Sequence, residues 1–99
     1  MTPDQLESLT AQTGYSRFPL IDLTGYVHVK DVLTLTERDV PVPNRLLRPL
    51  PSVAVDASLR VVLETMRARG THLVRISDGV RALGVVAMED VLGELIGGG

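Results

Sequence analysis

The stretch that decides the fold is GYVHVKDVL at residues 25–33, because a near-copy, GVVAMEDVL, occurs at residues 84–92. Gly, Val, Asp, Val and Leu stand at the same five positions of both stretches, at an offset of 59 residues. Upstream, Gly14 and Gly70 each end a helix-like segment and precede a strand-like one, at an offset of 56 residues. Chance similarity of amphipathic segments rarely keeps Gly and Asp in step, so we interpret the chain as an internal duplication whose second hairpin is three residues longer.

Around the first copy, the pattern predicts helix, strand, turn, strand and helix. Thr2, Pro3 and Gln5 suit a capping box with proline at the first helical position, and Gly14 suits the end of that helix. Proline interrupts regular structure at Pro41, Pro43, Pro49 and Pro51, which predicts a linker. The expected elements are a helix over 3–13, strands over 17–22 and 26–29, a helix over 30–35 and a linker over 36–51.

Around the second copy, apolar residues at helical spacing predict a helix capped by Asp56 or Ser58 and ended by Gly70. Asp78 and Gly79 are typical of a hairpin turn. The expected elements are strands over 52–55, 71–77 and 82–88, a helix between Ser58 and Gly70, a helix over 89–96 and a loose tail over 97–99.

Composition excludes several classes of function. The 99-residue chain has a formal net charge of −2, which argues against a nucleic-acid partner. It has no Cys, which excludes disulfides and thiolate zinc sites. Its longest apolar run, residues 82–88, is far shorter than the roughly 20 residues that span a bilayer. No nucleophile elbow, glycine-rich phosphate loop or HExxH spacing is present, so we expect no enzymatic activity.

The repeated unit, closing on Gly-h-h-x-h-x-Asp, resembles the cystathionine-β-synthase (CBS) domain, which occurs in tandem pairs. SRFP at residues 16–19 ahead of residues 25–31, and GVVAMEDVLGELIG at residues 84–97, are similar to the CorC/HlyC family and its CNNM relatives. Those are integral-membrane proteins tied to magnesium and cobalt efflux. The resemblance implies an α/β fold: a tandem CBS pair of two small sheets related by a pseudo-two-fold axis, each packed by two helices, with the first repeat lacking its first strand. The implied organisation is a first repeat over 1–35, a linker over 36–51 and a second repeat over 52–99.

The same resemblance implies a regulatory module that senses an adenosine nucleotide, ATP or AMP, with magnesium as a candidate companion ion. The module would work at the cytoplasmic face of the membrane, joined to a membrane domain of the full-length protein. The alternative is a structural dimerisation module with no nucleotide ligand.

Asp90 and Asp31 are the candidate ribose-binding residues. A carboxylate at a helix start accepts hydrogen bonds from two adjacent hydroxyls, and charge-assisted bonds are the stronger kind. The alternative for each is to complement the first turn of its helix. Asp90 is the stronger candidate because Pro51 and Val53 belong to the linker that, in the family, forms one wall of the nucleotide cleft. Many nucleotide-binding relatives carry Ser or Thr three residues before the Asp, where this chain has His28 and Ala87.

Three basic side chains are candidates for phosphate contact. His28 and Lys30 alternate with Val27 and Val29, so they face away from any core that the valines enter. Arg17 begins a strand and could reach a phosphate or pair with an acidic neighbour. For His28 and Lys30, a solvated pair is the alternative.

A homodimer through the helices is the predicted assembly. The helices of the second half offer more apolar surface than one small sheet covers, centred on Leu63 and Leu92. The sheet of the first half is predicted to leave an unpaired edge on residues 26–29 or 17–22. The apolar residues concerned are Leu59, Val62, Leu63, Met66, Val91, Leu92, Leu95 and Ile96.

Overall fold

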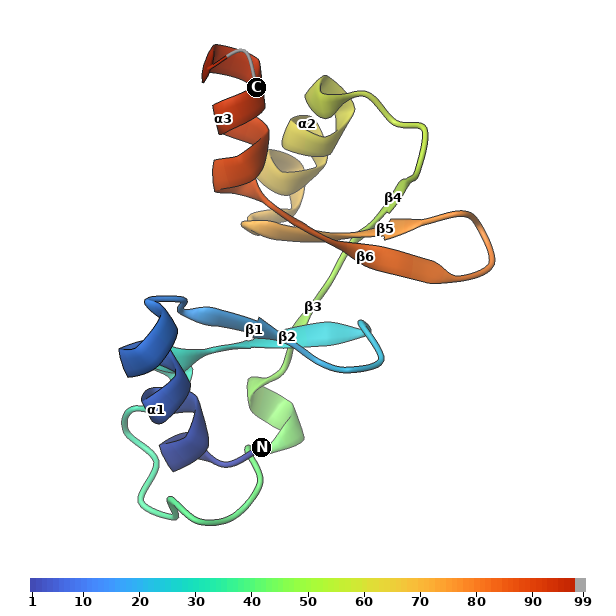
Figure 1. Cartoon of the computed structure of the whole chain (residues 1–99). Coiled ribbons are helices and arrows are strands. Elements are labelled where there is room, and N and C mark those ends of the chain that lie inside the picture. Colours follow the sequence, from blue (N-terminus) through green and yellow to red (C-terminus); the bar gives the residue numbers. More distant parts are fainter. Residues whose placement is uncertain (98–99) are drawn as a thin grey trace. The chain divides into compact units, whose positions relative to one another are not determined.

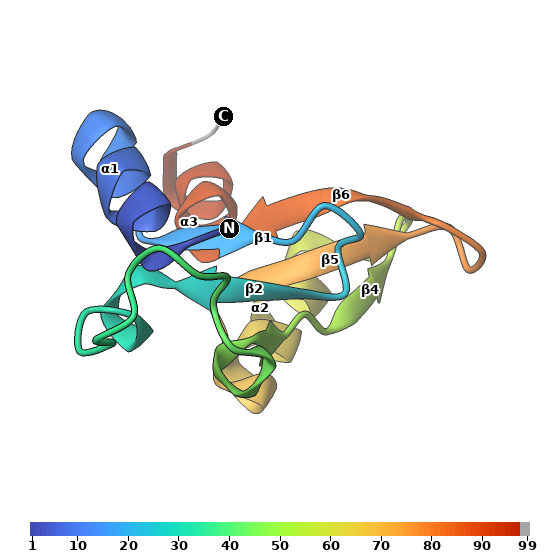
Figure 2. The ribbon, with the colours of Figure 1, turned by 90° about the horizontal axis from the view of Figure 1, so that it is seen from below.

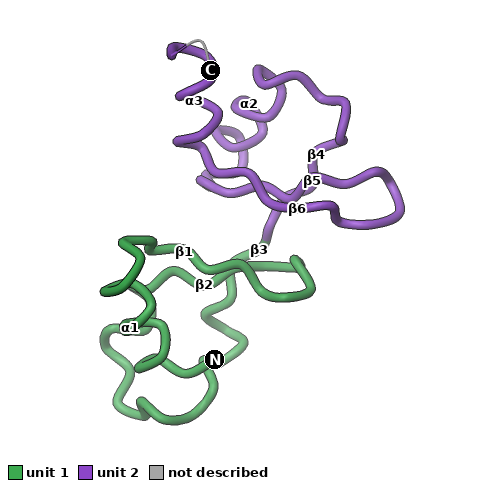
Figure 3. Tube along the Cα trace, in the orientation of Figure 1, with its two compact units in different colours: residues 1–49 green, residues 50–99 purple. Residues whose placement is uncertain are grey.

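The computed structural model describes residues 1–97, and the chain forms two compact units, residues 1–49 and 50–99 (Figure 3). Each unit holds one small three-stranded sheet with helical structure packed on it (Figure 1). The architecture is therefore α/β, with two sheets and three α-helices. Among residues 1–97, no helix combines the length and the apolar character needed to cross a membrane.

Helix α1 (Pro3–Thr13) opens the first unit with the predicted caps. The Thr2 hydroxyl accepts a hydrogen bond from the Gln5 amide at 3.2 Å, and the Gln5 side chain accepts one from the Thr2 amide at 3.0 Å. Gly14 ends the helix with a positive φ of 78°, which glycine adopts without steric cost. The predicted capping box and stop are confirmed.

The sheet of the first unit has β2 (Gly25–His28) between β1 (Arg17–Pro19) and β3 (Arg48–Pro49), and both pairings are antiparallel. Val27 and Val29 enter the core with Leu6 of α1 and Val32. Helix α1 thus packs on the face that the two valines line, and His28 lies on the opposite face.

The helix predicted over residues 30–35 is wrong. Only a short 3₁₀ turn, η1 (Val29–Asp31), forms there. The amides of Val32 and Leu35 each bond to a carbonyl three residues back, and the Arg38 guanidinium donates to the carbonyls of Val32 at 2.7 Å and Leu35 at 3.3 Å. The Arg38 guanidinium thus supplies hydrogen bonds to carbonyls that have no partner from a continuing α-helix. The first unit is packed by one α-helix rather than the predicted two.

The segment predicted as linker contains structure that completes the first sheet. A 3₁₀ turn, η2 (Asn44–Leu46), leads into β3, which pairs with β2 through Tyr26↔Arg48 and Gly25↔Pro49. Pro49 has no amide to donate, which suits an edge strand. Strand β2 is paired on both sides, so the alternative that places the open edge on residues 26–29 is wrong; β1 and β3 are the edge strands of this sheet among the described residues.

In the second unit, β5 (Leu73–Ser77) lies between β4 (Ser52–Ala54), which is parallel to it, and β6 (Ala82–Ala87), which is antiparallel (Figure 2). Helices α2 (Leu59–Arg69) and α3 (Met88–Gly97) lie side by side on one face of this sheet (Figure 1). The core between helices and sheet consists of Val53, Val62, Met66, Val74 and Val91.

The turns of the second unit follow the sequence closely. Of the two cap candidates, Ser58 caps α2, its hydroxyl accepting a hydrogen bond from the Val61 amide at 3.2 Å. The Asp78 carboxylate accepts hydrogen bonds from the amides of Val80 and Arg81 in the hairpin turn. Gly97 is the last residue of α3, and the remaining two residues of the predicted tail, 98 and 99, lie outside the described residues.

Candidate CBS-type ligand site

The predicted residues of the second unit gather at one end of its sheet. Because β4 is parallel to β5 and β6 is antiparallel to it, β4 and β5 begin where β6 ends. Ala87, the last residue of β6, pairs with Leu73, the first residue of β5. Pro51 precedes β4 at this end, where its carbonyl accepts a hydrogen bond from the Arg75 amide at 2.8 Å. Asp90 follows in the first turn of α3.

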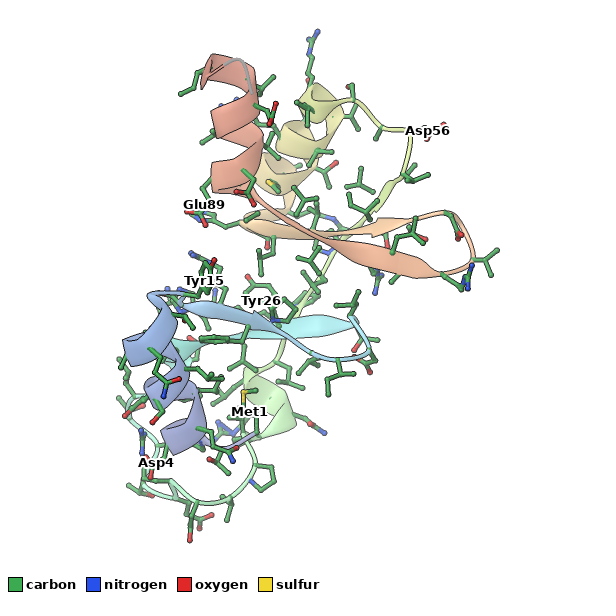
Figure 4. All side chains as sticks on the ribbon, in the orientation of Figure 1. Met1, Asp4, Tyr15, Tyr26, Asp56 and Glu89 are labelled. Carbon is green, nitrogen blue, oxygen red and sulfur yellow. The ribbon has the colours of Figure 1, made fainter. Side chains whose placement is uncertain are left out.

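The carboxylate of Asp90 is exposed and has no hydrogen-bond or ion-pair partner within residues 1–97. Its neighbour Glu89, labelled in Figure 4, marks the start of α3 and is also exposed. A negative charge in a first helical turn interacts favourably with the aligned peptide dipoles. Asp90 is therefore free to accept hydrogen bonds from a ligand.

The side chain of Val53 is 5% exposed and lies in the core, so only its backbone is available to a ligand at this end of the sheet. Ala87 is half-buried and offers a methyl group and no hydroxyl. Arg75 was not predicted as a site residue. Its Nε donates a hydrogen bond to the Ser52 hydroxyl at 2.7 Å, at the start of β4. The period-two alternation of β5 could have identified it, since Val74 enters the core and Arg75 must then lie on the opposite face.

In the first unit, Arg17 and His28 are direct partners across β1 and β2. The imidazole Nδ1 of His28 accepts a hydrogen bond from the Lys30 amide at 3.2 Å. Partial burial, with the nearby charges of Arg17, Arg48 and Lys30, lowers the pKa of His28 below its ordinary value. His28 is therefore less readily protonated than a free imidazole.

Asp31 is committed to an ion pair that the sequence did not reveal. Its two carboxylate oxygens accept from the Nε and Nη2 of Arg48, at 2.8 and 2.9 Å. These hydrogen bonds are the main reason that the pKa of Asp31 lies below its usual value. Asp31 lies in a 3₁₀ turn rather than at the start of a helix, and its bidentate ion pair links η1 to β3. No local sequence pattern indicates this ion pair, because Arg48 lies in the proline-rich segment, 17 residues from Asp31.

Family comparison decides the identity of this fold. The model of the CBS domain matches residues 38–97, more than half of the chain. The chain belongs to the CBS-domain family. The match covers all of the second unit's strands and helices together with β3.

The relatives of this CBS domain agree with the predicted resemblance. An uncharacterized protein of Mycobacterium tuberculosis (strain H37Rv) is 42% identical over 98 residues, 93% of this chain and 28% of that relative. Hemolysin C of Brachyspira hyodysenteriae is 32% identical over 77 residues, 77% of this chain and 28% of that relative. The chain therefore spans less than a third of the length of these two relatives.

A solved CBS domain of a bacterial CNNM/CorC family Mg²⁺ transporter, in complex with ATP, is similar in structure. Its TM-score is 0.80 at 27% sequence identity, and the match covers 97% of this chain and 74% of that one. The predicted likeness to CorC, CNNM and hemolysin-like proteins is confirmed. Within residues 1–97 of this CBS domain, no group of three or more acidic or histidine side chains is arranged to hold a metal ion.

Proposed function

We propose that this CBS domain is a regulatory module that binds an adenosine nucleotide at the sheet end of the second unit. The observation that carries the proposal is the free, exposed carboxylate of Asp90 in the first turn of α3, beside the end of β6. A solved domain of similar fold and 27% identity was determined in complex with ATP, which supports the same ligand class here. Asp90 would accept hydrogen bonds from the two ribose hydroxyls.

The second unit is favoured over the first because the two aspartates differ in availability. Asp31 already receives two hydrogen bonds from Arg48, whereas Asp90 receives none within residues 1–97. The Pro51 segment lies at the same sheet end as Asp90 and supplies the neighbouring surface.

The module's wider role rests on its relatives. We propose that residues 1–35 and 52–99 are two CBS repeats, related by a pseudo-two-fold axis and joined by a linker over 36–51. They would regulate a membrane-anchored magnesium or cobalt efflux-type protein from its cytoplasmic face. A nucleotide shifts such a module between two shapes only through its differential affinity for them.

Thermal melting with ATP, ADP and AMP, each with and without magnesium, tests nucleotide binding. A ligand present at 100 times its dissociation constant stabilises the folded state by about 2.7 kcal/mol. We expect Asp90→Ala to abolish the shift and to lower the melting temperature of the free protein no more than Glu89→Ala does, since both remove one charge from the first turn of α3. Glu89→Ala is the matched control, since Glu89 is an exposed carboxylate in the same turn. A full shift in Asp90→Ala would reject Asp90 as the binding residue.

The second candidate function is a dimerisation module without a ligand. Leu63 packs against the core of its own unit. The proposed interface is therefore centred on Leu92 and the other exposed apolar side chains rather than on Leu63. The apolar side chains left exposed on the two helices are Leu59, Val61, Leu92, Leu95 and Ile96. Burying this surface in a two-fold dimer would remove it from water.

Sedimentation equilibrium tests the dimer. We expect a dimer at tens of micromolar and a monomer for Ile96→Glu, since Ile96 is 85% exposed on α3. Val80→Glu is the control, because Val80 is 91% exposed in the β5–β6 turn and belongs to neither helix. A dimer without any nucleotide-induced melting shift would favour this second function.

A further inference from the structure

Strand β3 of the first unit depends on Arg48. The strand is only two residues long and pairs with one neighbour, β2. Backbone pairing of that length contributes little by itself. The two hydrogen bonds between Arg48 and Asp31 attach the strand to η1 through side chains as well. This ion pair therefore acts as a clasp on β3.

The Arg48–Asp31 ion pair lies among more basic than acidic side chains. Arg17 from β1, Lys30 from η1 and Arg48 from β3 all act on His28 of β2, and Asp31 is the one carboxylate acting on it. With His28 uncharged, the group carries a net charge of +2. The side chain of Arg48 is 36% exposed and that of Asp31 is 21% exposed, so solutes reach the pair from solvent.

A phosphate group is the natural competitor for Arg48. It carries more negative charge than a carboxylate and presents more acceptor oxygens, and the planar guanidinium binds both in the same bidentate geometry. Arg17 and Lys30 would attract a multivalent anion to this face, whereas Asp31 offers a single charge.

We propose that Arg48 is a switch residue whose guanidinium passes from Asp31 to the phosphates of a polyphosphate ligand, and that this transfer releases β3 from the sheet. The proposed phosphate site consists of residues of the first unit alone and goes beyond the nucleotide site proposed for the second unit. Strand β3 is the last element of the first unit, and the second unit begins at Leu50. Release of β3 would convert an ordered strand into free connecting chain.

Amide hydrogen exchange over residues 45–48 of the whole chain tests the clasp without any ligand. We expect Arg48→Gln and Asp31→Asn each to accelerate exchange there about tenfold, with no change over residues 82–97. Arg45→Gln is the matched control, because Arg45 is exposed on η2 and enters no ion pair among the described residues. Wild-type exchange rates in both clasp variants would overturn the proposal.

Sodium tripolyphosphate, which has neither ribose nor base, tests the release. We expect it to accelerate exchange over residues 45–48 in the wild type and to have no effect in Arg48→Gln. Sodium chloride at equal ionic strength separates competition from screening. Unchanged exchange in the wild type, or equal acceleration by sodium chloride, would overturn the switch. A failure of the nucleotide proposal looks different: ATP would then produce no melting shift, whatever the exchange results are.

Discussion

The two units share a strand pairing but complete their sheets differently. Arg17↔His28 and Phe18↔Val27 in the first unit correspond to Leu73↔Ala87 and Val74↔Val86 in the second, at the same offsets of 56 and 59 residues. The third strand of the second unit, β4, comes before the helix and pairs with β5. The third strand of the first unit, β3, comes after the repeat and pairs with β2. The two hairpins thus share their register. The third strand differs, because it pairs with the second strand of the hairpin in the first unit and with the first strand of the hairpin in the second unit.

The equivalent aspartates show what this difference does to a repeated side chain. Strand β3 brings Arg48 to Asp31, and the carboxylate is clasped. In the second unit, β4 lies on the other side of β5 from β6, and Asp90 stays free within residues 1–97. The repeated aspartate is therefore ion-paired in the first unit, and it has no ion-pair partner within residues 1–97 in the second.

The largest expected effect concerns the two cores. Leu6→Ala in the first unit and Met66→Ala in the second each remove a side chain that is 0% exposed. We expect each to lower the free energy of unfolding by about 2–5 kcal/mol, because buried contacts are lost and a cavity remains. Urea denaturation measures the loss. A loss below about 1 kcal/mol in one unit only would show that its core repacks, which would break the comparison.

The repeated glycines should respond unequally to alanine. A Cβ on Gly25 would lie 2.6 Å from the Arg48 carbonyl oxygen, so β3 must move. A Cβ on Gly84 would meet nothing within 4 Å. We expect Gly25→Ala to cost about 1–3 kcal/mol of stability and Gly84→Ala less than about 0.5 kcal/mol. Denaturant titration of both variants checks this, and equal losses would contradict the close approach of β3.

The clasp should give the first unit a specific acid sensitivity. Because the folded-state pKa of Asp31 is lowered, its stabilisation is present above the unfolded-state pKa and is lost as the pH falls through the folded-state pKa. Since the pair is partly exposed, we expect Asp31→Asn to cost about 1 kcal/mol at pH 7. The difference between wild type and variant should shrink steadily as the pH falls below the ordinary pKa of Asp. Asp22 and Asp78 also have lowered pKa values, so only this difference isolates Asp31. A difference that stays constant as the pH falls would contradict the ion pair.

The smallest effect sharpens the assignment of the second unit. Ala87→Thr places a hydroxyl at the end of β6, three residues before Asp90. One added hydrogen bond of about 1 kcal/mol would tighten nucleotide binding about fivefold. Isothermal titration with ATP measures the change, and Val85→Thr, two residues back on the same strand face, is the control. Equal affinities of Ala87→Thr and wild type would remove the hydroxyl argument.

Local rules account for the features that were predicted well. The capping box at Thr2, the left-handed stops at Gly14 and Gly70, and the Asp78 turn all depend on residues within a few positions of one another. Val27 and Val29 enter the core, and strand alternation had placed these two valines opposite His28 and Lys30. The position of Asp90, after a strand and in the first turn of a helix, was likewise predicted from a local pattern.

The sequence by itself therefore determined the repeat, the hairpins, the helix ends and the core positions, since each depends on short spacing along the chain. Only the tertiary structure decided that β3 covers β2, that residues 30–35 do not continue as a helix, and that Asp31 is clasped. Arg48 meets Asp31 across 17 residues, and Arg38 meets Asp4 across 34. Such contacts form only when folding brings charges that are distant in sequence within reach of a charge-assisted hydrogen bond, so no local pattern of residues indicates them.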